Sequence, residues 1–205
     1  METKITDILN EKGVKYCFNE QKYDDKKLKF IIVGDNPGNK EYIEKRFFIG
    51  PSGIELRKHF KENNLCNDFD VECKIFNKSY IHTTKTKELE NIIPIIGEEL
   101  FSDIQIECAN EIAHLSNEYN LPILIFGKSN IGKNLLFDAF WVALNKSIIQ
   151  KENILVFSHP APPHFKFKEE WDFYKSRFEN ESPLNLLKKI GSTNTQIINN
   201  KYQKQ

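Results

Sequence analysis

The chain has 205 residues, with 29 basic and 29 acidic side chains and a formal net charge of zero. This length provides one α/β domain with a buried core and is too short for two large domains. The charge balance excludes blanket, histone-like binding to nucleic acid, although it permits a local basic groove. The hydrophobic fraction of 40% is that of a globular chain rather than a disordered one.

The sequence carries no sign of export or membrane insertion. No apolar run approaches the roughly 18 residues that cross a bilayer, and residues 1–7 lack the apolar core of a signal peptide. We therefore expect a cytoplasmic protein without a membrane partner. Its cysteines form no C-x-x-C pair, so we expect free thiols and neither a metal site nor a cofactor. They are Cys17, Cys66, Cys73 and Cys108.

Strand-like and helix-like segments alternate along the chain. Residues 28–33 are rich in β-formers and stop at Gly34, which predicts a buried strand. Ser52 is placed to cap the next helix, with Glu55 at the capping-box position. In chain order we expect a strand at 28–33, a helix at 52–63, a strand at 74–82, a helix at 98–119, a strand at 123–126, a helix at 132–145, a strand at 154–157, and helices at 169–178 and 183–190.

This alternation predicts a three-layer α/β/α fold around a four-stranded parallel sheet. Residues 1–190 are expected to form one domain. From Gly191 the sequence is polar and rich in Asn, Gln and Thr, which predicts a flexible tail over residues 191–205. Ligands of such sheets bind beyond the carboxyl ends of the strands. The loops that converge there follow Val33, Tyr80, Phe126 and Phe157.

Two of these loops carry distinctive motifs. The first reads Gly34-Asp35-Asn36-Pro37-Gly38, with Phe47-Phe48-Ile49-Gly50 downstream, and the last reads His159-Pro160-Ala161-Pro162. Together they resemble the two active-site motifs of the uracil-DNA glycosylase superfamily. The first motif of that superfamily has the form G-x-[D/N]-P-[Y/G] with a PF-x-G segment downstream, and the second has the form H-P-S-P. The resemblance spans nearly the whole chain in the right order.

The resemblance implies a monofunctional DNA glycosylase, which we expect to act as a monomer on single- or double-stranded DNA. Such an enzyme extracts a damaged or modified base from the stack. It then hydrolyses the N-glycosidic bond with an activated water while it stabilises the departing base anion. No lysine is obviously placed as a Schiff-base nucleophile, so attack by water is expected.

Three residues are candidate catalytic groups. The resemblance implies that His159 donates a hydrogen bond to the base oxygen as charge builds there, the alternative being a structural histidine. The resemblance also places Asn36 at the position that, in the superfamily, holds the water-placing Asp or Asn. An amide can orient a water but cannot accept its proton at neutral pH. Asp35 stands where the iron–sulfur-containing family has a functional Glu. It is either the water-activating base or a turn-forming residue.

The pocket for the base is expected to contain Gly34, Pro37, Gly38, Phe47, Phe48, His82 and Thr83. Phe48, or its neighbour Phe47, either stacks on the base or fills the core. In many superfamily members the second strand ends in an Asn that reads the Watson–Crick edge of uracil. Here the alignment leaves His82 or Thr83 at that position, because a one-residue slip exchanges the two faces.

A second departure from the superfamily lies in the first motif. Gly38 replaces the Tyr that, in the most uracil-restrictive family, blocks bases with a C5 substituent. Both departures favour a modified pyrimidine, or relaxed choice, over plain uracil.

Contacts to DNA are expected at the same end of the sheet. Lysines on loops and helix starts there suit phosphate binding, and the loop after His159 suits a wedge into the duplex through Pro163 or Phe165. Each of these residues has a solvated or purely structural alternative. The expected DNA contacts are Ser52, Lys85, Gly127, Lys128, Ser129, Pro160, Ala161, Pro163 and Phe165.

Two other functions fit parts of the sequence. Gly127 to Lys133 has the G-x-x-x-x-G-K spacing of a phosphate-binding P-loop. However, Asn134 stands where magnesium coordination needs Ser or Thr, and no later strand ends in the expected Asp. The other alternative is a catalytically inactive module that binds a base or DNA on the same fold, which Asn36 and the missing specificity Asn would suit.

Overall fold

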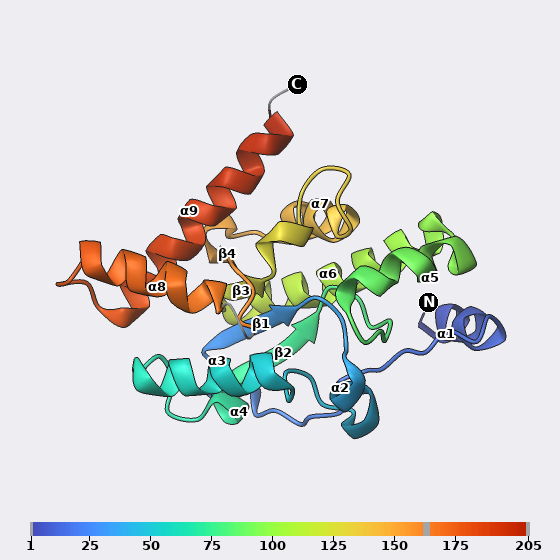
Figure 1. Cartoon of the computed structure of the whole chain (residues 1–205), viewed down its shortest axis with the longest axis horizontal. Helices are drawn as coiled ribbons and strands as arrows, with labels where there is room; N and C mark the ends of the chain where they lie inside the picture. The colour runs from blue at the N-terminus through green and yellow to red at the C-terminus, as the bar shows by residue number, and fades with distance from the viewer. Residues whose placement is uncertain (1, 162–164, 204–205) are drawn as a thin grey trace.

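Four parallel strands form the centre of the computed structural model, which describes residues 2–161 and 165–203 (Figure 1). The strand order is β2-β1-β3-β4. In register, Gly34 pairs with Asn77, and Phe126 pairs with Phe157, so the carboxyl ends of the strands meet at one edge. The strands are β1 (Phe30–Gly34), β2 (Cys73–Asn77), β3 (Ile123–Phe126) and β4 (Ile154–Phe157).

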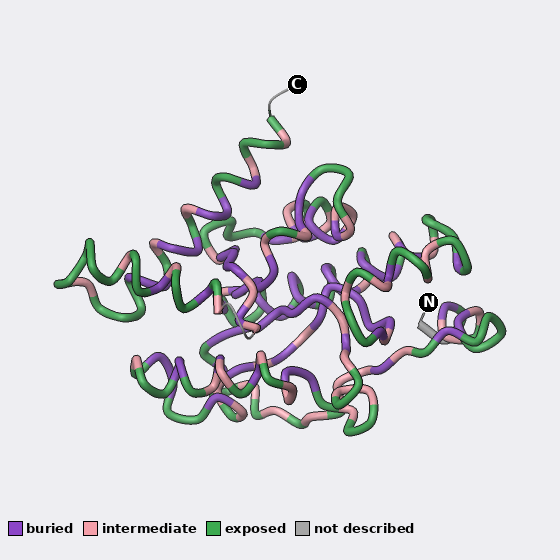
Figure 2. The backbone as a smooth tube through the Cα atoms, in the orientation of Figure 1, coloured by how far each residue is buried: buried purple, intermediate pink, exposed green. Residues whose placement is uncertain are grey.

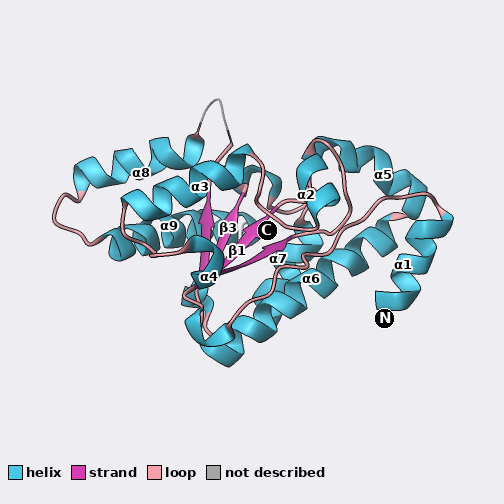
Figure 3. Ribbon diagram, turned by 90° about the horizontal axis from the view of Figure 1, so that it is seen from below, coloured by secondary structure: helices cyan, strands magenta, loops and turns pink. Residues whose placement is uncertain are grey.

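Helices cover both faces of the sheet (Figure 3). Successive strand residues point to opposite sides, and both sets of side chains are apolar, so each face needs a covering layer. Ile31 and Val33 enter one core, and Phe30 and Ile32 enter the other. The first face packs against α1 (Glu2–Glu11), α5 (Leu89–Ile96), α6 (Glu98–Tyr119) and α7 (Asp138–Ser147). The second packs against α3 (Pro51–Glu62), α4 (Phe69–Glu72), α8 (Lys166–Arg177) and much of α9 (Pro183–Gln203).

This arrangement confirms the predicted three-layer α/β/α fold, and Figure 2 shows the buried backbone running through the strands. The remaining helix, α2 (Asn39–Glu44), follows the first motif at the carboxyl edge of the sheet. Among the described residues, no helix is long and apolar enough to cross a membrane.

The predicted flexible tail is wrong for residues 191–203, which continue α9. A Cβ at Gly191 would lie 2.6 Å from Leu155 Cβ, so this glycine allows the helix to approach β4 closely. The polar residues after it bind backbone carbonyls of β4, the strand at the edge of the sheet. Asn194 Nδ2 donates to Val156 O at 3.0 Å, and Thr195 Oγ1 donates to the next outward carbonyl, that of Ile154, at 2.9 Å.

The predicted strand over residues 74–82 is also corrected, because β2 ends at Asn77. From there the chain follows the loop after β1. Lys78 N donates to Gly34 O at 3.0 Å, and Ser79 N donates to Asp35 O at 3.2 Å. Ile81 then forms an isolated bridge to Tyr16. The apolar pair Tyr80-Ile81 therefore continues the core without continuing the strand.

Two helix starts also differ from expectation. The helix expected from Gly132 begins at Asp138, after a turn in which Asn134 has a φ of 60°. Helix α3 begins at Pro51 with Gly50 as its N-cap, so Ser52 lies inside the first turn and is not the cap. Proline suits the first helical position because a backbone N–H there has no acceptor within the helix, so its absence costs no hydrogen bond.

Candidate active site

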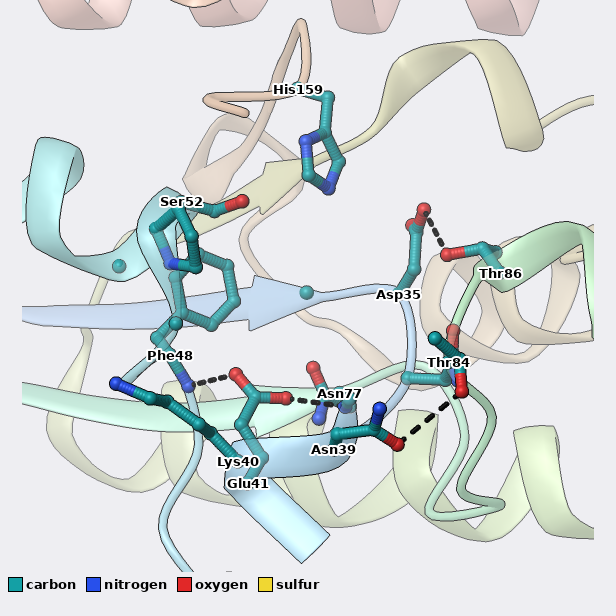
Figure 4. A pocket seen from close by; sticks show the side chains of 16 residues that line it. Asp35, Asn39, Lys40, Glu41, Phe48, Ser52, Asn77, Thr84, Thr86 and His159 are labelled. Carbon is teal, nitrogen blue, oxygen red and sulfur yellow. Dashed lines mark hydrogen bonds between the residues drawn. The ribbon is translucent and has the colours of Figure 1, made fainter. Parts of the chain in front are cut away.

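A cavity of about 470 Å³ opens at the carboxyl edge of the sheet (Figure 4). Its walls come from the loop after β1, the start of α2, the first turn of α3, the end of β2 with the loop beyond it, and the loop after β4. The residues that line the cavity include Gly34, Asp35, Asn36, Gly38, Lys40, Glu41, Phe48, Ser52, Asn77, Thr86 and His159. Three of the four expected loops therefore line one cavity, as the topology predicts.

Phe48 forms one wall of the cavity, packed against the end of β1. A Cβ at Gly34 would lie 2.4 Å from Phe48 Cε2 and 2.4 Å from Asn77 Oδ1, so only glycine lets both side chains close over the strand. Phe48 has a left-handed φ of 54°, and Arg57 Nη1 donates to its carbonyl. Phe47 instead lines a different cavity with Phe76. The structure therefore places Phe48, not Phe47, at the candidate base site.

Glu41 fixes this wall, and the sequence analysis missed it. Its Oε2 accepts the Gly38 N–H at 2.9 Å and its Oε1 accepts the Phe48 N–H at 2.6 Å. Burial raises the pKa of Glu41, while these backbone donors act to lower it. One carboxylate thus joins the first motif to the segment that carries the aromatic ring. Its position three residues after Gly38, as the N3 residue of a short helix, was the available signal.

Asp35 directly follows β1, is buried, and accepts hydrogen bonds on both of its carboxylate oxygens. Lys78 Nζ donates to Oδ1, and Asn130 Nδ2 donates to Oδ2 at 2.7 Å, with Thr86 Oγ1 at 3.5 Å from the same oxygen. Lys78 is completely buried and also donates to Phe126 O at 2.5 Å. Burial lowers the pKa of Lys78, and the Asp35 carboxylate opposes this change.

His159 faces Asp35 across the cavity (Figure 4). Its Nδ1 accepts the Ala161 N–H at 3.2 Å, which assigns the proton of the neutral ring to Nε2. Nε2 points into the cavity. Burial lowers the pKa of His159, with Asp35 raising it and Lys78 lowering it to a lesser extent. At neutral pH the ring is therefore a neutral hydrogen-bond donor aimed at whatever occupies the cavity.

Asn77 takes the place at the end of the second strand that was assigned to His82 or Thr83. It is only 4% exposed, and its Nδ2 has no hydrogen-bond partner among the described residues. His82 and Thr83 do not line the cavity. His82 Nδ1 donates to Pro37 O at 2.9 Å, and Thr83 N donates to the same carbonyl at 3.3 Å. Both brace the first motif from behind.

Asn36 also forms hydrogen bonds with this segment of the chain after β2. Its Nδ2 donates to Thr83 Oγ1 at 2.8 Å and to Ile81 O at 3.3 Å. Its Oδ1 is buried and has no partner within the described part of the chain. Asn36 lines the cavity, and its amide oxygen is a buried acceptor that has no hydrogen-bond partner among the described residues.

The side of the cavity at Gly38 is open. A Cβ at Gly38 would meet no atom within 4 Å among the described residues. Lys40 lies on the same rim, exposed to solvent. Ser52 lines the cavity from the first turn of α3.

The other expected DNA contacts divide into exposed and engaged residues. Lys85 and Ser129 are exposed, whereas Lys128 Nζ binds Glu170 Oε1 at 2.7 Å and Asn194 Oδ1 at 3.0 Å. Gly127 has a left-handed φ of 87° and packs over Asp35, where a Cβ would lie 2.6 Å from Oδ1.

The loop after His159 lies partly outside the described residues. Pro160 and Phe165 border a small hollow beside α3, next to His59. The Ala161 N–H holds His159, as described above. Pro163, an expected wedge residue, lies outside the described residues.

The P-loop alternative does not fit the observed backbone. A P-loop lysine sits at the start of its helix, but α7 begins five residues beyond Lys133, at Asp138. Asn130 instead donates a hydrogen bond to Asp35, and the backbone of Gly127 packs against the same carboxylate. Within residues 2–161 and 165–203, no three His, Cys, Asp or Glu side chains gather in a group able to hold a metal.

Comparison with known proteins agrees with this geometry. The family model of the uracil DNA glycosylase superfamily matches residues 21–178, a span that contains both motif loops and Asn77. No curated protein matches the chain. Superfamily membership indicates DNA glycosylase chemistry and DNA as the partner. The fold, the placement of the two motifs and the family match together show that the chain belongs to the uracil-DNA glycosylase superfamily.

Proposed function

We propose that this protein is a monofunctional DNA glycosylase that removes uracil, or a uracil carrying a C5 substituent, from DNA. The observation that carries the proposal is the placement of four groups around one cavity: the Phe48 ring, the Asn77 amide, the His159 Nε2–H and the Asp35 carboxylate. Each matches one requirement of base excision.

The base is held by stacking and by its edge. Glu41 binds the backbone N–H of Phe48, and Arg57 binds its backbone carbonyl. The aromatic ring of Phe48 is therefore held in place and suits stacking on an extruded base. The edge of uracil presents an N3–H donor beside the O4 acceptor. An amide such as Asn77 can accept from the first and donate to the second. We therefore favour uracil-type bases as substrates, because Asn77 at the end of β2 can take the place of the Asn that the sequence alignment did not find.

Bond cleavage places charge on both halves of the substrate. As the bond between N1 of the base and C1′ breaks, its electron pair stays on the base and its O2 becomes negative. The neutral His159 ring donates an Nε2 hydrogen bond to that oxygen. The sugar becomes an oxocarbenium-like cation, which the Asp35 carboxylate stabilises.

Water completes the reaction. Its oxygen bonds to C1′, and its proton finally neutralises the base anion, so the products are the free base and an abasic sugar. Lys78 and Asn130 each donate a hydrogen bond to one of the two oxygens of Asp35, so the carboxylate is held as a fixed negative group beside the cavity. Asp35 is therefore assigned to stabilise the cation and orient the water. The free Oδ1 of Asn36 accepts a second hydrogen bond from that water.

The test is a panel of single- and double-stranded oligonucleotides carrying uracil, hypoxanthine, xanthine or C5-substituted uracils, followed by alkaline cleavage. The proposal predicts abasic sites in the uracil-type substrates. Binding to these oligonucleotides without abasic sites would instead support the inactive binding module. Borohydride trapping of a covalent complex, lost in Lys40→Ala, would contradict the water mechanism.

A further inference from the structure

A polar network lies beneath the loop that carries His159. At its centre is Glu170 of α8, whose side chain is 12% exposed. Its Oε2 accepts the Ser158 N–H at 3.2 Å. Its Oε1 accepts from Lys128 Nζ at 2.7 Å and from Asn194 Nδ2 at 2.8 Å. Glu170 thus joins the ends of β3 and β4 to two helices.

Asn194 closes the network on the strand side. Its Oδ1 accepts from Lys128 Nζ at 3.0 Å, and its Nδ2 also donates to Val156 O at 3.0 Å. The backbone is therefore held at Val156 and again at Ser158, immediately before the loop turns towards the cavity. Lys128 serves as the counter-ion of Glu170.

The contacts of His159 itself are local. The Ala161 N–H reaches the ring from two residues along the chain, so this bond depends on the backbone turn over residues 158–161. That turn begins where Glu170 holds the Ser158 N–H. We propose that Glu170 is a positioning residue for His159, acting through the Ser158 N–H, and that Lys128 and Asn194 hold the Glu170 carboxylate in place. The expected effect of Glu170 on the excision rate rests on the proposed function, whereas its expected effect on the His159 ring does not.

The neighbouring residue provides a matched control. Glu169 lies on the same turn of α8, carries the same charge and is exposed. Glu169→Ala therefore removes a negative charge close to the network without removing any of its hydrogen bonds. Glu170→Ala removes the acceptor of Ser158 altogether. Glu170→Gln leaves one acceptor oxygen, for which Lys128 and Asn194 compete with the Ser158 N–H.

The first measurement needs no substrate. Imidazole ¹⁵N shifts, assigned to His159 by its absence in His159→Ala, report which ring nitrogen carries the proton. We expect a single Nε2–H tautomer in the wild type and in Glu169→Ala. We expect a mixture of both tautomers in Glu170→Ala and Glu170→Gln. An unchanged tautomer in both Glu170 variants would overturn the proposal. If Glu170→Ala fails to fold, Glu170→Gln alone decides the outcome.

The second measurement is the single-turnover excision rate. Misplacement of His159 should lower the rate about 10- to 100-fold in Glu170→Ala, with Glu169→Ala like the wild type. In the His159→Ala background, Glu170→Ala should change the rate less than about twofold, because both act through one group. Additive losses would contradict a role through His159. Absence of excision in the wild type would overturn the proposed function, while the tautomer measurement would still decide the role of Glu170.

Discussion

The carboxylate of Asp35 is paired with the ammonium of Lys78, which has no exposed surface. Lys78 follows β2, and Asp35 follows β1, so the pair lies where these neighbouring strands end. A buried charge is tolerated when it is paired and hydrogen-bonded. Phe126 O also accepts from Lys78, and Asn130 and Thr86 donate to Asp35. The pair keeps a carboxylate in the interior at the edge of the candidate site.

Removing one member of this pair should destabilise the protein. Lys78→Met leaves an unpaired buried carboxylate, and we expect a loss of about 3–5 kcal/mol in the free energy of unfolding. Combining it with Asp35→Asn removes the isolated charge and should recover part of that loss. Urea unfolding of the two single variants and the double variant measures the coupling. Purely additive losses would show that the two side chains do not interact.

Asp35 and Asn36, the two residues proposed to hold the water, should differ in their effect on the excision rate. Asp35→Asn removes the charge proposed to stabilise the cation, so it should lower the excision rate more than Asn36→Ala, which removes one proposed hydrogen bond to the water. The comparison is made by single-turnover kinetics at a temperature where circular dichroism shows both variants folded. The reverse ranking would make Asn36 the principal water-holding residue and Asp35 a structural partner of Lys78.

Asn77 should determine which base edge is accepted. In Asn77→Asp the carboxylate has no donor for O4 of uracil but can accept from the amino group of cytosine. Excision of uracil should fall at least about 10²-fold, because a site built for a hydrogen bond discriminates strongly when the partner is lost. Rates on matched uracil and cytosine oligonucleotides measure the change. Asn64→Asp, the same change at an exposed residue just beyond the C-terminal end of α3, serves as the comparison. Equal effects of the two variants would argue against edge reading by Asn77.

Gly38 should determine the size of base that is accepted. Because a side chain at Gly38 meets open space, Gly38→Tyr can place a ring in the cavity without a clash in the described structure. The ratio of rates for a C5-substituted uracil and for uracil should fall at least about tenfold. Gly38→Ala should move the ratio less. A ratio that stays constant in Gly38→Tyr would show that this position does not face C5 of the base.

The sequence predicted the sheet and the two motif loops because each rests on local signals. Apolar runs stopped by Gly34 and Gly127 mark strand ends, and His159-Pro160 follows a third such run. Asn77 was missed because Tyr80 and Ile81 prolong the apolar pattern beyond the true end of β2. The hydrophobic pattern cannot distinguish a strand from a buried loop that follows it.

The partners of the site residues were not predictable from local patterns. Lys78, Asn130 and Glu170 each meet their partner across more than ten positions of the chain. In the sequence, Lys78 and Glu170 resemble ordinary surface charges. The second half of α9 was missed for a related reason, since Asn194 and Thr195 look like solvent-exposed residues but bind the carbonyls of β4.

The most direct test of the proposed function is the single-turnover excision rate of His159→Ala on a uracil-containing oligonucleotide. Removing one donor to a developing oxyanion typically costs about 10²–10³ in rate. Among the described residues, the hydrogen bond of the ring goes to the Ala161 N–H of its own loop, so we expect the fold to be preserved, which circular dichroism checks. The account predicts a loss of this size with substrate binding retained. A folded variant that cleaves at the wild-type rate would contradict it.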